Sequence, residues 1–213
     1  MYQVFIGSLM LSIIHALIPN HWLPLIAVGK TEKWGPKQAL WATIVTGAAH
    51  SLSTVMIGIV VGLVGYRLSA GYSVISETIA PAILVGLGII YIMLGFRHHN
   101  HHHGHQATDL LAGKGNNKSG RAAILASLSM AMFLTPCVEI EAYYFQAGTI
   151  CWIGIFIVSA VYVVTTLVVM VFLVTLGMKG ASLLISRFPA NLEKTITGLV
   201  LVALGILAFR VKF

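Results

Sequence analysis

The chain has 213 residues, of which 58% are hydrophobic and only 9% are charged. A soluble domain carries about 25% charged residues. The apolar side chains of this chain are too many for a soluble core, so lipid must be the solvent for most of its surface. The net charge of +7 does not indicate a nucleic-acid partner, because the basic residues are spread between apolar segments rather than gathered in one patch.

Six apolar segments are long enough to cross a membrane, which takes about 20 residues in a helix. We expect these helices at 2–28, 39–66, 77–96, 122–148, 150–178 and 193–211. The first has no basic start and no cleavage site, so we expect a retained helix rather than a signal peptide. A short turn from Gln146 to Thr149 should join the fourth and fifth helices, which would then pack antiparallel.

The basic residues predict the orientation. The loops that follow the first, third and fifth helices contain ten Lys and Arg, and the opposite side has three. Positive loops stay in the cytoplasm. We therefore expect a multi-pass protein of the plasma (inner) membrane, with both termini outside and the long loop 98–121 in the cytoplasm.

The two halves of the chain resemble each other. Pro19 in the first helix matches Pro136 in the fourth, and the third and sixth helices end in Leu-Gly-Phe-Arg97 and Leu-Ala-Phe-Arg210. An odd number of spans per half makes the halves antiparallel, and such repeats with broken helices are typical of transporters. We predict an all-α membrane protein of six transmembrane helices. It would be one transporter domain over 1–213, built from inverted three-helix repeats 1–97 and 122–213 with proline-broken helices 1 and 4.

Polar side chains fall near the middle of several predicted helices. A charged group there costs about 2.5–3.5 kcal/mol, so these side chains should face a cavity, each other or a cation. Imidazole, thiolate and carboxylate together suit a borderline divalent transition metal. The candidate metal-binding residues are His15, Asn20, His21, His50, Cys137, Glu139 and Glu141.

Both prolines should open their helices at this depth. Pro19 cannot donate to the carbonyl of His15, and Pro136 cannot donate to that of Met132. His15 and His21 converge well only if the helix unwinds at Pro19. Glu139 and Glu141 point apart on a regular helix, so either this segment is irregular or Glu139 acts as a counter-charge or proton carrier.

The long loop contains six imidazoles within eight residues, a composition typical of metal binding. We predict an accessory metal-binding loop, with a solvated linker as the alternative. Its histidines are His98, His99, His101, His102, His103 and His105.

Three short motifs resemble the nickel/cobalt transporter (NicO) family of the lysine-exporter superfamily. His15 to His21 resembles the H-x4-D-H motif of its first helix, Gly47-Ala-Ala-His50 its Gly-His, and Thr135-Pro136-Cys137 its Pro-Cys. The His-rich loop is similar to that of its efflux members. Asn20 replaces the Asp of the motif, and Glu139 and Glu141 follow the Pro-Cys where apolar residues are expected. The resemblance implies nickel or cobalt as the metal. Because of the two departures, zinc, manganese and iron are alternatives.

We accordingly predict a transporter that exports a divalent transition metal as its substrate. It is not expected to be an enzyme or to use an organic cofactor. The chain has no GxxxxGK[ST] motif, so a gradient must drive transport, and protons are the plausible coupling ion. Expected partners are the lipid bilayer and the metal, with a homo-oligomer as an open alternative. Two other functions compete: a CcdA-like thiol or electron carrier using Cys137 and Cys151, and a membrane metal-binding assembly factor without transport.

Overall fold

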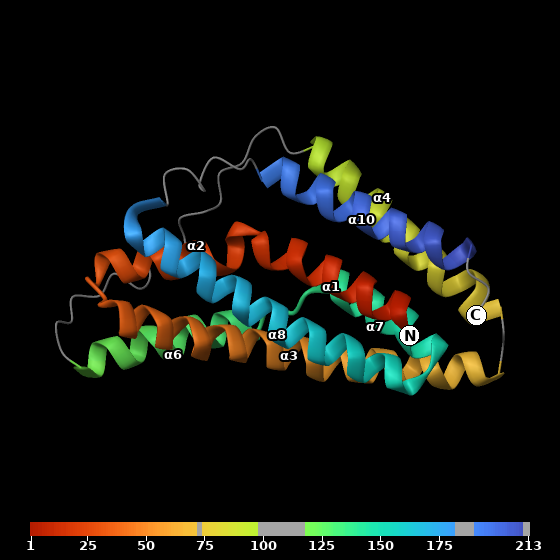
Figure 1. Cartoon of the computed structure of the whole chain (residues 1–213), viewed down its shortest axis with the longest axis horizontal. Coiled ribbons are helices and arrows are strands. Elements are labelled where there is room, and N and C mark those ends of the chain that lie inside the picture. The colour runs from red at the N-terminus through yellow and green to blue at the C-terminus, as the bar shows by residue number, and fades with distance from the viewer. Residues whose placement is uncertain (72–73, 98–117, 182–189, 211–213) are drawn as a thin grey trace.

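The computed structural model describes residues 1–71, 74–97, 118–181 and 190–210 (Figure 1). All regular secondary structure within these ranges is helical. The α-helices are α1 (Tyr2–Leu17), α2 (Pro19–Thr31), α3 (Pro36–Gly71), α4 (Ala80–Arg97), α6 (Lys118–Phe133), α7 (Val138–Ile150), α8 (Trp152–Leu176) and α10 (Ala190–Arg210), and two π-helical turns are η1 (Ile75–Ile79) and η2 (Gly177–Ala181).

Both predicted proline breaks are present. Ile18 leaves the helical conformation (φ −59°, ψ 126°) and separates α1 from α2, which begins at Pro19. Proline suits this first helical position because its missing N–H would have no partner there in any case. In the second half, α6 ends at Phe133 and α7 begins at Val138, and the two helices are bent by 49° at this break.

The predicted turn between the fourth and fifth helices lies in the wrong place. Residues 146–149 are the last full turn of α7, and the chain reverses at Cys151, which is extended (φ −169°). The hydroxyl of Thr149 donates to the carbonyl of Gln146 within this helix. Gly148 packs on the backbone of α3, where a Cβ would collide with the carbonyl of Gly62, so this glycine permits close helix packing rather than a turn. The reversal nevertheless lays α8 back along α7 (Figure 1).

The spans are counted by length and apolar composition. Three helical stretches are long and apolar enough to cross a membrane: Tyr2–Thr31, Pro36–Ala70 and Trp152–Gly180. The bent pair Gly120–Phe133 and Val138–Ile150 makes a fourth if it is one span. In the described part of the chain, the third and sixth predicted spans form shorter apolar helices, Glu77–Met93 and Thr195–Arg210. The chain is therefore a helical protein with three to four long candidate spans.

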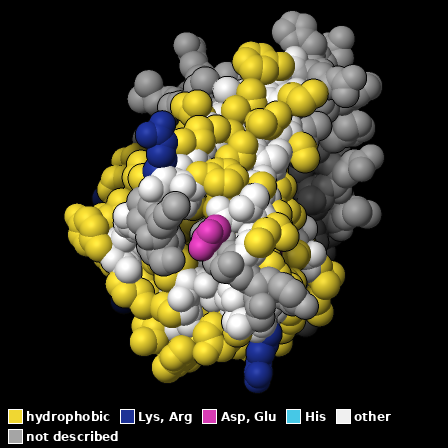
Figure 2. Space-filling model, turned by 90° about the vertical axis from the view of Figure 1, so that its right-hand side faces the viewer, with side chains coloured by type: hydrophobic (Ala, Val, Ile, Leu, Met, Phe, Trp, Pro, Cys, Tyr) yellow, Lys and Arg dark blue, Asp and Glu magenta, His cyan; other side chains and the backbone are white. Residues whose placement is uncertain are grey.

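The surface is apolar where a soluble protein would be polar. In the most apolar window of α8 only 33% of the residues are buried. Phe156, Val164, Val168 and Phe172 on this helix are each more than 60% exposed. One end of the molecule likewise shows mainly hydrophobic side chains and few charged ones (Figure 2). The exposed apolar sides of α8 fit a lipid environment.

The helices pack in two groups. Helices α1, α3, α7 and α8 lie against one another, and α4 runs beside α10 along the edge of this bundle (Figure 1). The two backbones of the α4–α10 pair approach closely at Gly88 and Gly198. A Cβ on either glycine would lie 2.6 or 2.5 Å from the carbonyl oxygen of the other, so only glycine fits.

Two apolar clusters form the core. One surrounds Ile140, Tyr144 and Val158 on α7 and α8, and it includes Cys137. The other surrounds Trp22 on α2 and includes Met170 and Leu173 of α8. The buried polar residues at the two helix breaks lie where these clusters meet, since His21 directly precedes Trp22 and Cys137 belongs to the first cluster.

Candidate metal centre

The break between α1 and α2 brings two histidines together. His15 lies in the last turn of α1 and His21 in the first turn of α2. Because Pro19 has no N–H, the carbonyl of His15 accepts from the amide of Ile18 instead, at 3.1 Å. The extended Ile18 turns the chain so that the two imidazole ring centroids lie 4.6 Å apart. The predicted condition for their convergence, an unwound helix at Pro19, is confirmed.

The break between α6 and α7 supplies a thiol and a carbonyl. Cys137 precedes α7 in an extended conformation (φ −96°, ψ 107°) and is buried. Pro136 leaves the carbonyl of Met132 without its helical donor, and Nδ1 of His50 on α3 lies 3.1 Å from this oxygen. A carbonyl oxygen only accepts, so Nδ1 carries the proton. Nε2 of His50 therefore presents its lone pair on the other side of the ring, toward Cys137.

Four side chains from these segments form one buried group. The ligand atoms of His15, His21, His50 and Cys137 all lie within 4.8 Å of one another. The sulfur of Cys137 is 3.0 Å from Nε2 of His15 and 3.1 Å from Nε2 of His50. Tetrahedral zinc, with bonds of about 2.0–2.3 Å, needs ligand atoms about 3.3–3.8 Å apart. Shifts of about 1 Å would thus close this group around a cation.

The group is buried, and two of its histidines have ring nitrogens without a hydrogen-bond partner among the described residues. His15, His50 and Cys137 are at most 5% exposed. Nδ1 of His15 and Nδ1 of His21 are buried, and neither has a hydrogen-bond partner in the described part of the chain. A buried polar atom without a partner costs about 1–3 kcal/mol. A metal removes this cost only for a nitrogen that it binds directly, and a histidine that ligates through Nε2 keeps its proton on Nδ1. The buried His₃Cys group could hold a metal ion.

Tyr162 on α8 is a site residue that the sequence analysis missed. Its hydroxyl lies 3.2 Å from Nε2 of His50 and 3.8 Å from the sulfur of Cys137, and the residue is fully buried. The hydroxyl of Thr54, one turn after His50 on α3, lies 3.5 Å from the same oxygen. One sequence feature could have identified Tyr162: it is the one tyrosine of the very apolar helix α8 and lies within one turn of the polar pair Thr165 and Thr166.

A cavity of about 350 Å³ opens next to the group. His15, His21 and Cys137 line it, whereas His50 is not among its lining residues. Other polar residues on its wall are Asn20 and Glu139, two of the predicted site residues, together with Tyr91 of α4 and Thr135. A hydrated ion could approach three of the four donors through this space.

The two carboxylates do not belong to the four-residue group. Helix α7 is regular from Val138, so Glu139 and Glu141 point in different directions, as their spacing requires. Glu139 lines the cavity and is 9% exposed. Glu141 is not among the residues lining that cavity, and both of its carboxylate oxygens are buried without a hydrogen-bond partner among the described residues. Glu139 thus shares the cavity wall with three of the four donors, while its role as a counter-charge and direct ligation by either carboxylate stay predictions.

The predicted accessory loop lies outside the described residues. This applies to all six of its histidines, from His98 to His105.

Comparison with known proteins adds no assignment. No protein-family model, no curated protein sequence and no solved structure matches the chain.

Proposed function

We propose that this protein carries a divalent transition metal cation across the membrane, as a gradient-driven exporter similar to the nickel/cobalt transporter family. The observation that carries the proposal is the buried group of His15, His21, His50 and Cys137 at two helix breaks. Helix breaks at matching positions in two halves of a chain are the usual place of a transporter's substrate site. A cation held there is the cargo, and the adjoining cavity gives it access.

The donor set favours nickel, cobalt or zinc. Imidazole suits these metals, and a thiolate further favours borderline or soft cations over hard ones. Three neutral imidazoles and one thiolate carry a single negative charge. Manganese prefers carboxylate and water ligands, and neither Glu139 nor Glu141 belongs to the group. Manganese is therefore the least suitable of the five metals expected from the sequence. Iron is intermediate between manganese and the favoured metals nickel, cobalt and zinc.

Contacts between α4 and α10 support the inverted repeat. If Arg97 corresponds to Arg210, then Val85 corresponds to Gly198 and Ile92 to Gly205. A Cβ on Gly205 would lie 3.0 Å from the amide nitrogen of Val85, and one on Gly198 would lie 2.9 Å from that of Ile92. Each contact is the counterpart of the other, as a two-fold relation between halves requires. This supports six spans, in which α4 and α10 are the third and sixth.

The distance between the two cysteines argues against the thiol carrier. Cys137 and Cys151 flank the 13-residue helix α7, which is about 20 Å long at 1.5 Å per residue. A disulfide needs Cα atoms less than about 7 Å apart. Moreover, the sulfur of Cys151 faces Met1 at 3.9 Å, at the far end of α7 from the metal centre.

Metal flux into proteoliposomes tests the function. We expect the wild-type protein to move Ni²⁺, Co²⁺ or Zn²⁺ and His50→Gln to reduce that flux at least tenfold. Cys137→Ser should do the same, whereas Cys151→Ser, the matched control, should transport like the wild type. Saturable metal binding without flux would instead support the assembly factor. Equal behaviour of both cysteine variants for every metal would overturn the proposed site.

A further inference from the structure

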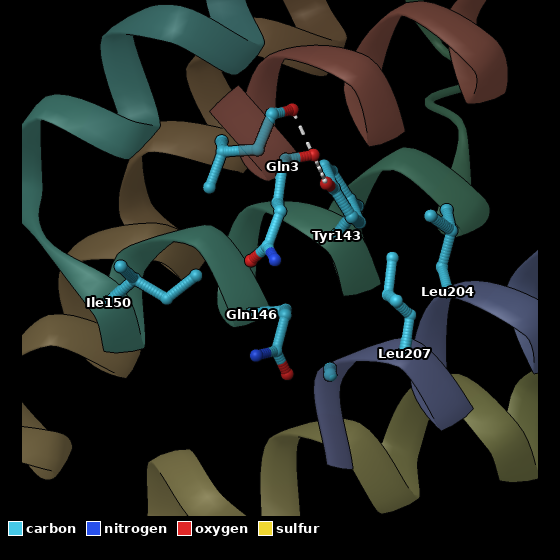
Figure 3. A pocket seen from close by; sticks show the side chains of 8 residues that line it. Gln3, Tyr143, Gln146, Ile150, Leu204 and Leu207 are labelled. Carbon is cyan, nitrogen blue, oxygen red and sulfur yellow. Dashed lines mark hydrogen bonds between the residues drawn. The ribbon is translucent and has the colours of Figure 1, made fainter. Parts of the chain in front are cut away.

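A second, smaller pocket lies at the end of the molecule where α1 begins. It has a volume of about 30 Å³, and its wall combines residues of α1, α7 and α10 (Figure 3). One water needs roughly 10–15 Å³ of such space, so the pocket has room for about two. Its polar residues are Gln3, Tyr143 and Gln146, and its apolar wall includes Ile150, Leu204 and Leu207.

Gln146 marks this pocket as a site for a polar occupant. The side chain is only 3% exposed, yet both its amide nitrogen and its amide oxygen have no hydrogen-bond partner among the described residues. An amide buried between leucines without partners is costly, so water or an ion is expected beside it. Gln3 of α1 brings a second amide to the same wall (Figure 3).

One face of α7 links this pocket to the metal cavity. Glu139, Tyr143 and Gln146 are spaced by four and three residues, so they share a face of the helix. Glu139 lines the metal cavity, while Tyr143 and Gln146 line the small pocket. Glu139 and Gln146 are seven residues, or about 10 Å, apart along the helix axis. On α1, the buried Ser8 and Ser12 continue the face of His15 toward the same end.

Tyr143 stands between Glu139 and Gln146 on this face of α7 and lines the small pocket. Its hydroxyl donates toward the backbone carbonyls of Gln3 and Val4, at 3.4 and 3.3 Å (Figure 3). Gly7 on α1 makes room for the phenol, because a Cβ there would collide with the tyrosine hydroxyl. The ring is held only by these long hydrogen bonds and by packing, so it can be displaced without breaking a helix.

We propose that the pocket between Gln3, Tyr143 and Gln146 is a hydrated station on the cation's route from the buried metal centre to the end of the protein at which α1 begins. Tyr143 is the barrier between the station and the centre. Amide oxygens and water are weak ligands for these metals, so the station lowers the cost of rehydrating the ion without retaining it. The inference rests on the proposed transport function and adds the route and its barrier.

Cysteine labelling tests whether the station is hydrated, independently of transport. In a Cys151→Ser background, Gln146→Cys should react with a small water-soluble methanethiosulfonate at least ten times faster than Ala147→Cys. Ala147 is the matched control because it is equally buried but belongs to the apolar cluster. Intact-protein mass spectrometry measures the rate, and the unsubstituted background gives the baseline for Cys137. Equal rates at 146 and 147 would overturn the hydrated station.

Flux and binding measurements then test the route. Gln146→Leu should reduce Co²⁺ flux at least fivefold and leave Co²⁺ affinity, read from thiolate charge-transfer absorption, unchanged. Tyr144→Phe is the control, since that buried tyrosine donates to Ser159 rather than into the pocket. If Gln146→Leu does not fold, Gln3→Leu makes the same test from α1. Wild-type flux in these variants would refute the route alone, whereas absence of flux in the wild type would refute the proposed transport.

Discussion

The carbonyl oxygen of Met132 lies 3.1 Å from Nδ1 of His50, across the interface between α6 and α3. Pro136, four residues later, has no N–H to donate to this oxygen, which instead accepts from the amide and the hydroxyl of Thr135, at 3.4 and 3.2 Å, and from His50. The break in one helix thereby fixes the tautomer and ring orientation of a histidine on another. Such contacts behind a ligand commonly tune metal affinity by 10–100-fold.

Replacing Pro136 with alanine should weaken metal binding. The new N–H can donate to the carbonyl of Met132 and compete with His50 for it. We expect Pro136→Ala to lower Co²⁺ affinity in detergent by about tenfold or more. Pro36→Ala, at the first turn of α3 where no helical bond is missing, should leave the affinity unchanged. Equal affinity in both variants would show that the carbonyl does not orient His50.

Removing the hydroxyl of Tyr162 should have a smaller effect. With a metal bound, Nε2 of His50 would be occupied, and the hydroxyl would have two acceptors within reach, the sulfur of Cys137 at 3.8 Å and the hydroxyl of Thr54 at 3.5 Å. One such hydrogen bond contributes about 0.5–1.5 kcal/mol, which is a factor of about 2–10 in affinity. Tyr162→Phe should therefore bind Co²⁺ about 2–10 times more weakly and shift the thiolate-to-cobalt absorption band. An unchanged band position would place the hydroxyl outside the metal's surroundings.

Metal affinity should rise with pH. The thiol of Cys137 must lose its proton to ligate, and imidazole must be neutral, so binding releases protons into solution. Below the thiol's pKa, one released proton makes the affinity fall about tenfold for each unit by which the pH is lowered. Calorimetric titrations in buffers of different ionisation enthalpy count the protons released. Cys137→Ser should release about one proton fewer, and an equal count would exclude the thiolate as a ligand.

The close approach of α4 and α10 should be sensitive to a single methyl group. Gly198→Ala places a Cβ 2.5 Å from the carbonyl oxygen of Gly88, so the backbones must separate. Overpacking of this kind costs about 1–3 kcal/mol. We expect a lower thermal midpoint in detergent for Gly198→Ala than for Gly86→Ala, where a Cβ would meet nothing within 4 Å. Equal midpoints would mean that the pair separates at no cost.

The local chemistry of proline made the helix breaks predictable. Pro19 and Pro136 each remove a specific helical hydrogen bond, and both breaks were predicted from the sequence together with the carbonyls that they free. Pro24 stands inside α2 without ending it, so proline alone does not decide where a helix breaks. The convergence of His15 and His21 followed from the first break. The contact of these two histidines with His50 and Cys137 was expected because polar side chains at the same depth are costly to expose to lipid and therefore pack against one another.

Other features depend on packing that the sequence does not display. Gly148 and Thr149 suggested a turn, but both lie within α7, where the glycine permits the close approach to Gly62. Tyr162 was missed because an apolar helix is rich in large side chains, and only the rotation of α8 decides which of them faces the centre. The position of Glu139 on the cavity wall likewise depends on the angle at which α7 leaves the break.

The depth of the metal centre has an electrical consequence that follows from α3. Trp41 and Tyr66 are exposed near the two ends of this unbroken helix, where aromatic residues meet the membrane interfaces. They are about 37 Å apart along the helix axis, somewhat longer than a hydrocarbon core of about 30 Å, as a tilted helix requires. If Trp41 and Tyr66 mark the two interfaces, His50, about 14 Å from Trp41 along the helix axis, is at an intermediate depth between them. A divalent ion moving between the centre and one surface would cross roughly half the membrane voltage, worth about 2.3 kcal/mol per 100 mV, so voltage should alter how readily the centre fills.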